Sequence, residues 1–386
     1  MKKVLLTAMA LLTIASTSVF GMYGANSDWI DFLVHGNQLR ARMQQFGFVL
    51  GNDMIKGTVG FRSEGSALGA IMNTTTVTPN GSATKQFFDF LPTVSVGIGY
   101  TSDVFGIGLG YNYTYKHNNV PAATKNGYGL SIHTPVLAIN AINDSLRIAI
   151  PIQVAVKNGD IANISDKEKY MGISMDPQIR YYTGIEAFNE IRLYVYYGMN
   201  EYTSQAGTKQ TASSFGFELR PYFGATVGDV ALKPFVKIGY DTALDAKGKV
   251  VGAASTRVSS SSDVRYSTPV AGEATYDSNP WELRLIPTLG LSANSDIVSL
   301  YLEAGVGYVA NDTGRKLNAG QYGITHKLGW SSYGGIYITP VKDLEWYFEA
   351  EIGNYNIEGA TDAASFGDLN VQFNASTGIT WYLPAL

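Results

Sequence analysis

The sequence contains no cysteine, which excludes disulfide bonds, cysteine-ligated metal sites and the lipidated cysteine of bacterial lipoproteins. Charged residues are also scarce, at 16% of the chain. Predominantly helical proteins carry more charge, because Glu and Lys cover their surfaces. Beyond the N-terminus no run of about 18 apolar residues occurs, so no transmembrane helix is expected in the mature chain.

Catalytic and metal-binding motifs are missing as well. The four histidines, His35, His117, His133 and His326, have neither a second histidine nor a carboxylate at metal-ligand spacing. The glycine-rich GIGLGY, residues 106–111, lacks the spacing of a nucleotide loop. No nucleophile is accompanied by a recognisable His or Asp partner. We therefore expect no cofactor, no metal and no enzymatic activity.

An export signal begins the chain. MKKVLLTAMALLTIASTSVFG has two lysines, an apolar run and small residues at cleavage spacing, so residues 1–21 are predicted to be a Sec-type signal peptide cleaved near Gly21. Its removal takes two of the 28 basic residues and none of the 32 acidic ones, leaving a net charge of -6. An acidic chain does not favour nucleic acid as a partner. Residues 22–386 are expected to form a single domain.

What the sequence has in abundance is alternation of apolar and polar residues. In DLNVQFNASTGITWYLPAL, which starts at Asp368, apolar residues occupy the odd positions over 15 residues, with Thr377 as the exception. A period of two is typical of a β-strand, and this one exceeds the usual 5 to 6 residues of soluble proteins. A tilted strand that crosses a bilayer needs about 9 to 11 residues. The pattern therefore predicts membrane-spanning strands.

Short turns alternate with long connections along the chain. Tight turns are predicted near 51–53, 101–105, 139–144, 184–189, 226–229, 293–296 and 339–343. The connections between these hairpins are rich in Ser, Thr, Asn, Gly and Ala, and are predicted at 62–86, 116–127, 157–176, 200–213, 241–280, 309–321 and 355–366. This alternation is typical of outer-membrane barrels, which have short periplasmic turns and long outer loops.

The predicted fold is therefore all-β: a transmembrane antiparallel β-barrel of about 16 strands, within a range of 14 to 16. Seven hairpins supply fourteen strands and the C-terminal strand is the fifteenth. Residues Trp29 to His35 are the candidate for a short first strand, although they could also start a helix. Pairing of the last strand with the first would remove both sheet edges. Prolines within predicted strands are interpreted as bulges or strand ends, at Pro92, Pro135, Pro151, Pro177, Pro221, Pro234 and Pro287.

If the apolar faces meet lipid, charged side chains of both signs line the lumen. The basic candidates are Arg147, Arg180, Arg192, Arg220, Lys233, Lys237 and Arg284, and the acidic ones are Glu218, Glu282, Glu303, Glu345, Glu349 and Glu351. Two interpretations remain open. The charges could set a transverse field across a water-filled pore, or they could pair and hold together a lumen that conducts little.

Aromatic residues often fall near the predicted strand ends. Candidates for a girdle at the lipid headgroups are Tyr100, Tyr111, Tyr113, Trp281, Tyr308, Trp330, Trp346 and Trp381. The alternative is ordinary packing within the sheet.

The two ends of the chain resemble a known family. MKKVLLTAMALLTIASTSVFGMYG, then WIDFLVHGNQLRARM and FGFVLGN, and the ending GITWYLPAL are similar to the variable surface proteins of intestinal spirochaetes. The resemblance implies an abundant surface-exposed protein of the cell outer membrane that helps to vary the antigenic coat. It supplies no catalytic or ligand motif.

The function expected from these observations is display of variable loops on the cell surface, without enzymatic activity. The alternative is a general diffusion porin with a weakly selective aqueous pore. Expected partners are outer-membrane lipid and, through the outer loops, host antibodies or a host surface; a homo-oligomer is left open. The longest connection, residues 241–280, is expected to stand out as an immunodominant surface, and the alternative is that it folds into the barrel mouth, where Lys247, Lys249, Arg257 and Arg265 would face luminal acids.

Overall fold

The computed structural model is built of β-strands, as the alternation predicts. It describes residues 39–42, 45–52, 54–63, 73–77, 85–89, 92–102, 104–118, 128–158, 169–203, 207–250, 256–258, 260, 266, 269, 271–316, 322–342, 344–354, 363–366 and 369–383. No helix in this part of the chain is long and apolar enough to cross a membrane.

One antiparallel sheet contains nineteen of the strands, and β4 and β5 form a separate hairpin. The strands are β1 (Leu39–Arg42), β2 (Gln45–Gly51), β3 (Ile55–Ser63), β4 (Asn73–Val77), β5 (Lys85–Asp89), β6 (Pro92–Thr101), β7 (Gly106–Asn118), β8 (Tyr128–Ala141), β9 (Leu146–Asn158), β10 (Lys169–Met175), β11 (Gln178–Tyr182), β12 (Phe188–Thr203), β13 (Lys209–Phe223), β14 (Ala225–Val227), β15 (Val230–Ala243), β16 (Trp281–Asn294), β17 (Val298–Lys316), β18 (Tyr322–Val341), β19 (Leu344–Gly353), β20 (Ala363–Phe366) and β21 (Leu369–Leu383).

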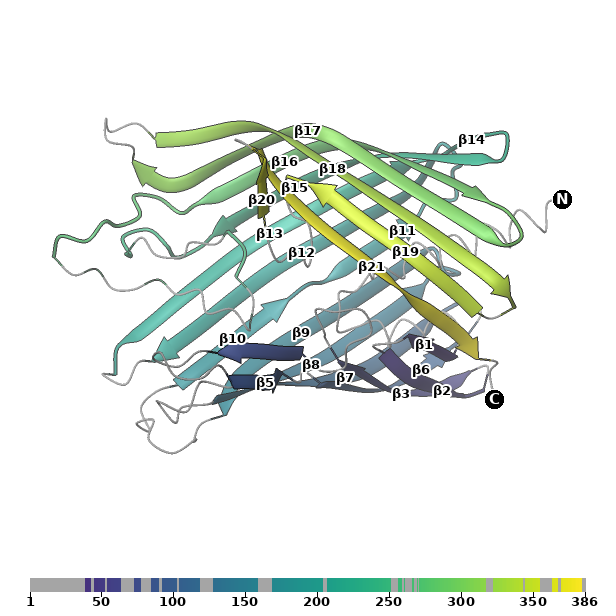
Figure 1. The fold of residues 1–386 in the computed structure, drawn as a ribbon, viewed down its shortest axis with the longest axis horizontal. Helices are drawn as coiled ribbons and strands as arrows, with labels where there is room; N and C mark the ends of the chain where they lie inside the picture. The colour runs from purple at the N-terminus through teal and green to yellow at the C-terminus, as the bar shows by residue number, and fades with distance from the viewer. Residues whose placement is uncertain are drawn as a thin grey trace.

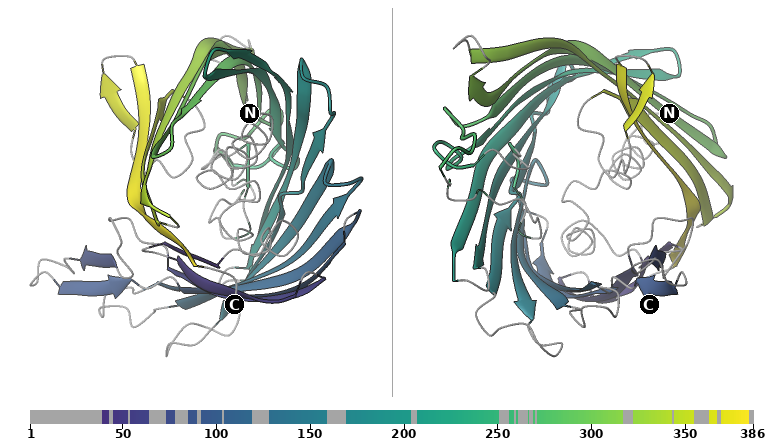
Figure 2. Two further views of the ribbon diagram at one scale, coloured as in Figure 1. Left: turned by 90° about the vertical axis from the view of Figure 1, so that its right-hand side faces the viewer. Right: turned by 60° about the vertical axis from the view of Figure 1, so that its left-hand side comes forward.

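The sheet closes on itself through its first strand. β1 pairs with the end of β21, from Leu39 opposite Leu383 to Arg42 opposite Thr380, and with β2 at Arg42 opposite Gln45. Closure satisfies the backbone groups that an open sheet would leave unpaired in lipid. Figure 2 shows the sheet from two further directions, where its strands curve around a central lumen. The predicted pairing of the last strand with the first is confirmed.

Three pairs of strands lie end to end, so the nineteen strands occupy sixteen positions in the ring. β10 and β11 both pair with β9 and β12, β13 and β14 both pair with β15, and β19 and β20 both pair with β21. The predicted barrel of about 16 strands is confirmed. The closing strand is Leu39–Arg42, whereas the candidate at Trp29 to His35 lies outside the described residues.

Tight turns gather at one end of the barrel and long connections at the other (Figure 1). All seven predicted turns fall at or overlap the observed ones. The turn predicted at residues 139–144 begins later than expected, because β8 continues to Ala141. Ile142, Asn143 and Asp144 have positive φ values of 56°, 51° and 66°, and the backbone N–H of Ser145 donates to the Ile142 carbonyl at 3.0 Å. Asn and Asp tolerate this left-handed conformation.

Several strands are longer than predicted and extend into the residues expected to form the long connections. β10 occupies part of the connection expected at 157–176, and the ends of β12 and β13 occupy part of the one expected at 200–213. The prolines match the expectation of bulges or strand ends only in part. Pro92 begins β6 and Pro177 separates β10 from β11, but the register continues across Pro234 and on both sides of Pro135 without a bulge. A missing N–H therefore weakens these ladders locally without shifting them.

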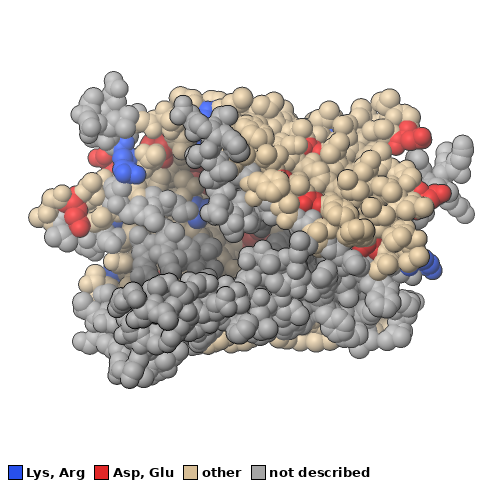
Figure 3. All heavy atoms as spheres, in the orientation of Figure 1, with Lys and Arg blue, Asp and Glu red and all other residues tan. Residues whose placement is uncertain are grey.

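The two faces of the sheet differ in character. On β16, Leu283, Leu285 and Leu289 are exposed, while the alternate positions Arg284, Thr288 and Ser292 are buried. Exposed apolar side chains recur on most of the other spanning strands, including Ile98, Leu109, Leu302 and Leu328. In Figure 3 tan atoms cover most of the described surface of one face, and charged atoms lie mainly toward its two ends. An apolar exterior over a polar interior is the pattern of a membrane barrel.

Candidate functional site

The charged residues singled out from the sequence lie on the inner face of the barrel, and each is buried or half-buried. Arg180 and Arg284 are each 2% exposed. Glu218, Glu345 and Glu349 are also buried. The remaining eight are half-buried: Arg147, Arg192, Arg220, Lys233, Lys237, Glu282, Glu303 and Glu351.

Ion pairs connect many of these groups, both within one strand and between strands. Arg284 lies at the centre, with its Nη2 atom 2.6 Å from Oδ2 of Asp241 and its Nη1 atom donating to Glu282 at 2.8 Å. The Nη2 contact is an ion pair rather than a well-directed hydrogen bond. Glu218 pairs with Arg220 and lies 4.0 Å from Arg284. These contacts couple β13, β15 and β16 through their inner faces.

Similar pairs extend the network on both sides. The Arg192 guanidinium donates twice to Glu190, at 2.6 and 2.9 Å, and Lys237 lies 2.8 Å from Glu303. Asp241 and Glu190 were not among the predicted luminal groups. Asp241 was assigned to a loop, although it belongs to β15 opposite Glu282. Glu190 follows a turn by three residues, and the alternation of β12 with Arg192 is the signal that could have found it.

Cross-strand register aligns four arginines in a row that the sequence did not reveal. Arg147 on β9 lies opposite Arg180 on β11, Arg180 lies opposite Arg192 on β12, and Arg192 lies opposite Arg220 on β13. We call these four residues the arginine row. Adjacent strands are about 4.8 Å apart, so the row is roughly 14 Å long. Like charges directly opposite each other destabilise a sheet unless something compensates them.

Acidic residues collect on a different wall. Glu345, Glu349 and Glu351 alternate along β19 and face the lumen. In the order of sixteen positions β19 is seven from β11, close to half of the ring. Figure 2 likewise shows the teal strands β9 to β13 across the ring from the yellow-green β19 and β21. The described luminal charges therefore include ion pairs on the wall of β12 to β17 and a group of carboxylates on β19.

Described residues of the segment between β15 and β16 contact the inner wall of the barrel. Arg257 Nε donates to Asp241 at 3.1 Å, and its guanidinium lies 3.8 Å from the centroid of the Tyr196 ring. The backbone N–H of Val258 donates to the Ser214 hydroxyl at 2.7 Å. The Tyr170 hydroxyl donates to the Ser260 carbonyl at 2.6 Å. Each of these barrel partners faces the lumen.

The expectation that this segment stands out as a surface loop is therefore wrong for Arg257, Val258, Ser260 and the two buried tyrosines, Tyr266 and Tyr276. The alternative, in which it folds into the barrel mouth, is observed. Arg257 reaches a luminal acid as that alternative requires, whereas Lys249 pairs with Asp245 of the segment itself at 2.7 Å. Lys247 is exposed, and Arg265 lies outside the described residues.

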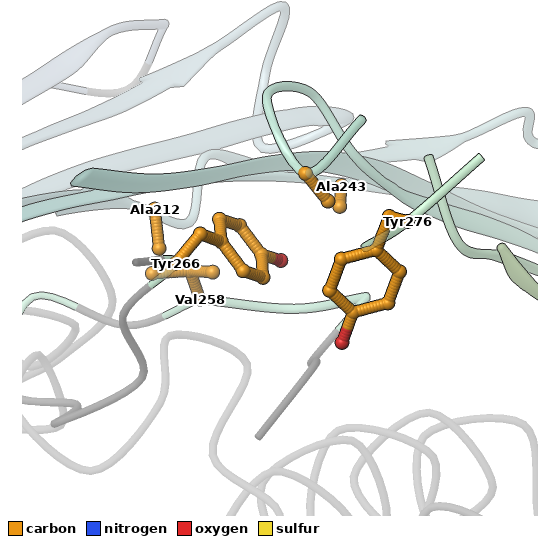
Figure 4. Packing of buried hydrophobic residues seen from close by; sticks show 6 residues of the cluster. Ala212, Ala243, Val258, Tyr266 and Tyr276 are labelled. Atoms are coloured by element: carbon orange, nitrogen blue, oxygen red, sulfur yellow. The ribbon is translucent and has the colours of Figure 1, made fainter. Parts of the chain in front are cut away.

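A small apolar cluster accompanies this inward packing (Figure 4). Tyr266 and Tyr276, each 1% exposed, pack with Val258 and Ala246 against Ala212 and Ala243 of the barrel wall. The two rings meet edge to face, with centroids 5.8 Å apart. Burial raises the pKa of the Tyr276 hydroxyl above its ordinary value. Buried aromatic area compensates the entropy lost by ordering a Ser- and Gly-rich chain.

The predicted girdle residues fall into two levels. Tyr100 and Trp346 are exposed near the tight-turn end, and the backbone of Trp381 pairs there with Leu344. Tyr113, Trp281, Tyr308 and Trp330 lie nearer the long-connection end, and Tyr111 lies near the middle of β7.

Two of these tyrosines form hydrogen bonds with histidines on the outer face. The Tyr111 hydroxyl is 2.5 Å from Nδ1 of His133, and the Tyr308 hydroxyl is 2.6 Å from Nδ1 of His326. Among the described residues no group of three or more His, Asp and Glu side chains is arranged to hold a metal ion.

Solved structures with a similar fold share little sequence with this chain. The copper transporter OprC is 11% identical, with a TM-score of 0.36, over 82% of this chain and 60% of its own length. OmpT, an outer membrane protein of Vibrio cholerae, is 12% identical (TM-score 0.35; 87% of this chain, 99% of that one). The translocator domain of autotransporter NalP from Neisseria meningitidis is 13% identical (TM-score 0.31; 98% of each chain). A search of curated proteins found no match.

A closed antiparallel barrel with an apolar exterior and a charged interior defines a transmembrane β-barrel of the outer membrane. The particular family follows from the sequence. Residues 2–382 match the family model of the Serpulina hyodysenteriae variable surface protein, and the chain belongs to this family. The protein is thus a surface protein of the outer membrane.

Proposed function

We propose that this protein displays its long connections to the outside of the cell as a variable antigenic surface and catalyses no reaction. The single observation that carries this proposal is the asymmetry of the closed barrel, with tight turns at one end and long connections at the other. Barrels of this kind tolerate sequence change in the outer loops, because those loops do not pair in the sheet. Membership of a variable surface protein family supports the same role.

Surface display is tested with single cysteines, since the native chain has none. Lys247→Cys lies in an exposed position at the long-connection end, and Val227→Cys lies at a tight turn. A membrane-impermeant maleimide should label Lys247→Cys on intact cells, and Val227→Cys only after the outer membrane is permeabilised. The reverse result would contradict the proposed orientation. Antiserum from an exposed host should bind intact cells and lose binding after long-loop exchange.

Processing and assembly belong to the same proposal. The N-terminus of the mature protein should lie near residue 22 when it is determined by mass spectrometry, since the leader has the features of a cleaved signal. A homo-oligomer stays a prediction, which cross-linking in native outer membranes tests.

A second candidate function is passive diffusion of solutes. The observation that favours it is the separation of luminal charge between the arginine row and β19. Such separation creates a transverse field if water fills the lumen. Purified protein in a planar bilayer should then show stepwise conductance, and a lack of steps would leave display as the sole function.

A further inference from the structure

One end of the arginine row differs from the other in how its charge is compensated. Arg192 binds Glu190, and Arg220 pairs with Glu218. Arg147 and Arg180 form no ion pair with any carboxylate in the described part of the chain. They lie directly opposite each other on adjacent strands and on the same face. Their Cβ atoms are therefore about 4.5 to 5.5 Å apart.

Several polar atoms around these two arginines lack hydrogen-bond partners. The Nε atoms of Arg147 and Arg180 are buried without an acceptor, and so is the hydroxyl of Tyr182, two residues beyond Arg180 on β11. The Tyr182 ring lies under the Arg147 guanidinium, 5.1 Å from its central carbon. Three donors thus lack acceptors within a patch formed by two neighbouring strands. A buried donor without an acceptor is costly, and a buried unpaired charge more so.

An anion would supply what this patch lacks. Guanidinium groups present planar pairs of N–H donors that match the oxygens of phosphate and carboxylate groups. Gln178, two residues before Arg180 on the same face, adds a buried side-chain oxygen without a donor, which suits the hydroxyl of a protonated phosphate. Because the patch lies on the inner face, the anion must come from solution in the lumen rather than from a lipid headgroup.

We propose that Arg147, Arg180 and Tyr182 form a binding site for a small oxyanion on the inner wall of the barrel, with inorganic phosphate as the ligand of best fit. The site lies beside the tight turns, whereas the β15–β16 segment comes from the long-connection end and reaches Tyr196. It is independent of surface display, because its residues belong to strands and not to outer connections.

Binding is measured on the full barrel in phospholipid-free detergent micelles. Inorganic phosphate is titrated against sodium chloride at matched ionic strength, and the unfolding temperature is followed, because a ligand that binds the folded state stabilises it. The wild type should be stabilised by phosphate more than by chloride. Arg180→Gln and Arg147→Gln should each weaken the apparent affinity by about tenfold or more. The control is Lys327→Gln, which removes an exposed cation of the lumen outside the proposed site. It should respond to phosphate as the wild type does.

Tyr182→Phe keeps the ring under Arg147 and removes only the hydroxyl donor, so it remains informative if an arginine variant fails to fold. It should fold as the wild type does and bind phosphate more weakly. Equal stabilisation by phosphate and chloride in the wild type would overturn the proposal. So would an unchanged phosphate response in Arg180→Gln or in Tyr182→Phe.

Discussion

Arg192 and Arg220 lie directly opposite each other on β12 and β13, and each guanidinium lies over the tyrosine of the other strand. The central carbon of Arg192 is 4.5 Å from the Tyr222 ring centroid, and that of Arg220 is 4.8 Å from the Tyr194 ring centroid. Register places Glu190 opposite Tyr222 and Glu218 opposite Tyr194. Each arginine therefore turns toward its own glutamate and away from the other cation.

The two glutamates of this arrangement differ in how many cations lie within ion-pair distance, which predicts different effects of substitution. Glu218 compensates Arg220 and lies near Arg284, whereas Glu190 pairs with Arg192. Removal of one partner of a buried pair costs about 3 to 5 kcal/mol. Glu218→Gln should lower the free energy of unfolding by an amount in that range, and Glu190→Gln by less. Urea unfolding in lipid vesicles measures both, and equal losses would contradict the central role of Glu218.

Orientation toward lipid predicts a second difference between two equally exposed side chains. Leu302 on β17 is 57% exposed on the outer face, and Ile185 in the turn before β12 is 58% exposed. Leu302→Arg should cost about 2 to 4 kcal/mol if it faces the hydrocarbon core, and Ile185→Arg close to nothing, because water reaches the turn. Refolding into vesicles at increasing urea measures the cost. Similar tolerance of both variants would mean that Leu302 does not contact lipid.

Much of this architecture was accessible from the sequence because it depends on local patterns. Alternation of apolar and polar residues alone predicts the strands and the tight turns between them. It also predicts the side of the sheet on which Leu283 or Arg284 lies. The closing strand at Leu39–Arg42 was not recognised, because four residues give too short a pattern. Strand limits were also too short beside the long connections, where the alternation continues beyond the span that lipid requires.

Properties that depend on the register between neighbouring strands could not be predicted from the sequence. The arginine row exists only because Arg180 meets Arg147 on one side and Arg192 on the other, and no local signal fixes that alignment. The direction of the β15–β16 segment depends on Arg257 meeting Asp241 and Tyr196, the latter 61 residues earlier in the chain. Composition favoured an exposed loop, and these long-range contacts decided otherwise.

Inward packing of the β15–β16 segment predicts slow maleimide labelling of cysteines at its buried positions. Val258 is 3% exposed, whereas Lys247 of the same segment is exposed. With single cysteines in the otherwise cysteine-free chain, a maleimide should label Val258→Cys at least about tenfold more slowly than Lys247→Cys, since labelling of the former requires local opening. Labelling rates of the purified barrel are followed by mass spectrometry. Equal rates for the two cysteines would mean that the segment does not dock.

A glycine on the barrel wall allows this docking and predicts how to reverse it. A Cβ atom added to Gly172 on β10 would collide with the backbone carbonyl group of Ser260, which cannot move without displacing the segment. Gly172→Ala in the Val258→Cys background should therefore accelerate maleimide labelling toward the rate of Lys247→Cys. The strand itself should tolerate alanine, because neighbouring Met171 and Ile173 already carry side chains there.

The matched control is Gly334→Ala on β18, where the added Cβ would meet only the end of the flexible Leu302 side chain, at 3.3 Å. This variant should leave labelling at Val258→Cys slow, and both alanine variants should keep the unfolding temperature of the barrel within a few degrees. Acceleration by Gly172→Ala alone would locate the contact between segment and wall at Ser260. Slow labelling in both variants would show that the Arg257–Asp241 ion pair and the tyrosine cluster hold the segment without that close approach, and Arg257→Ala would then be the variant that releases it.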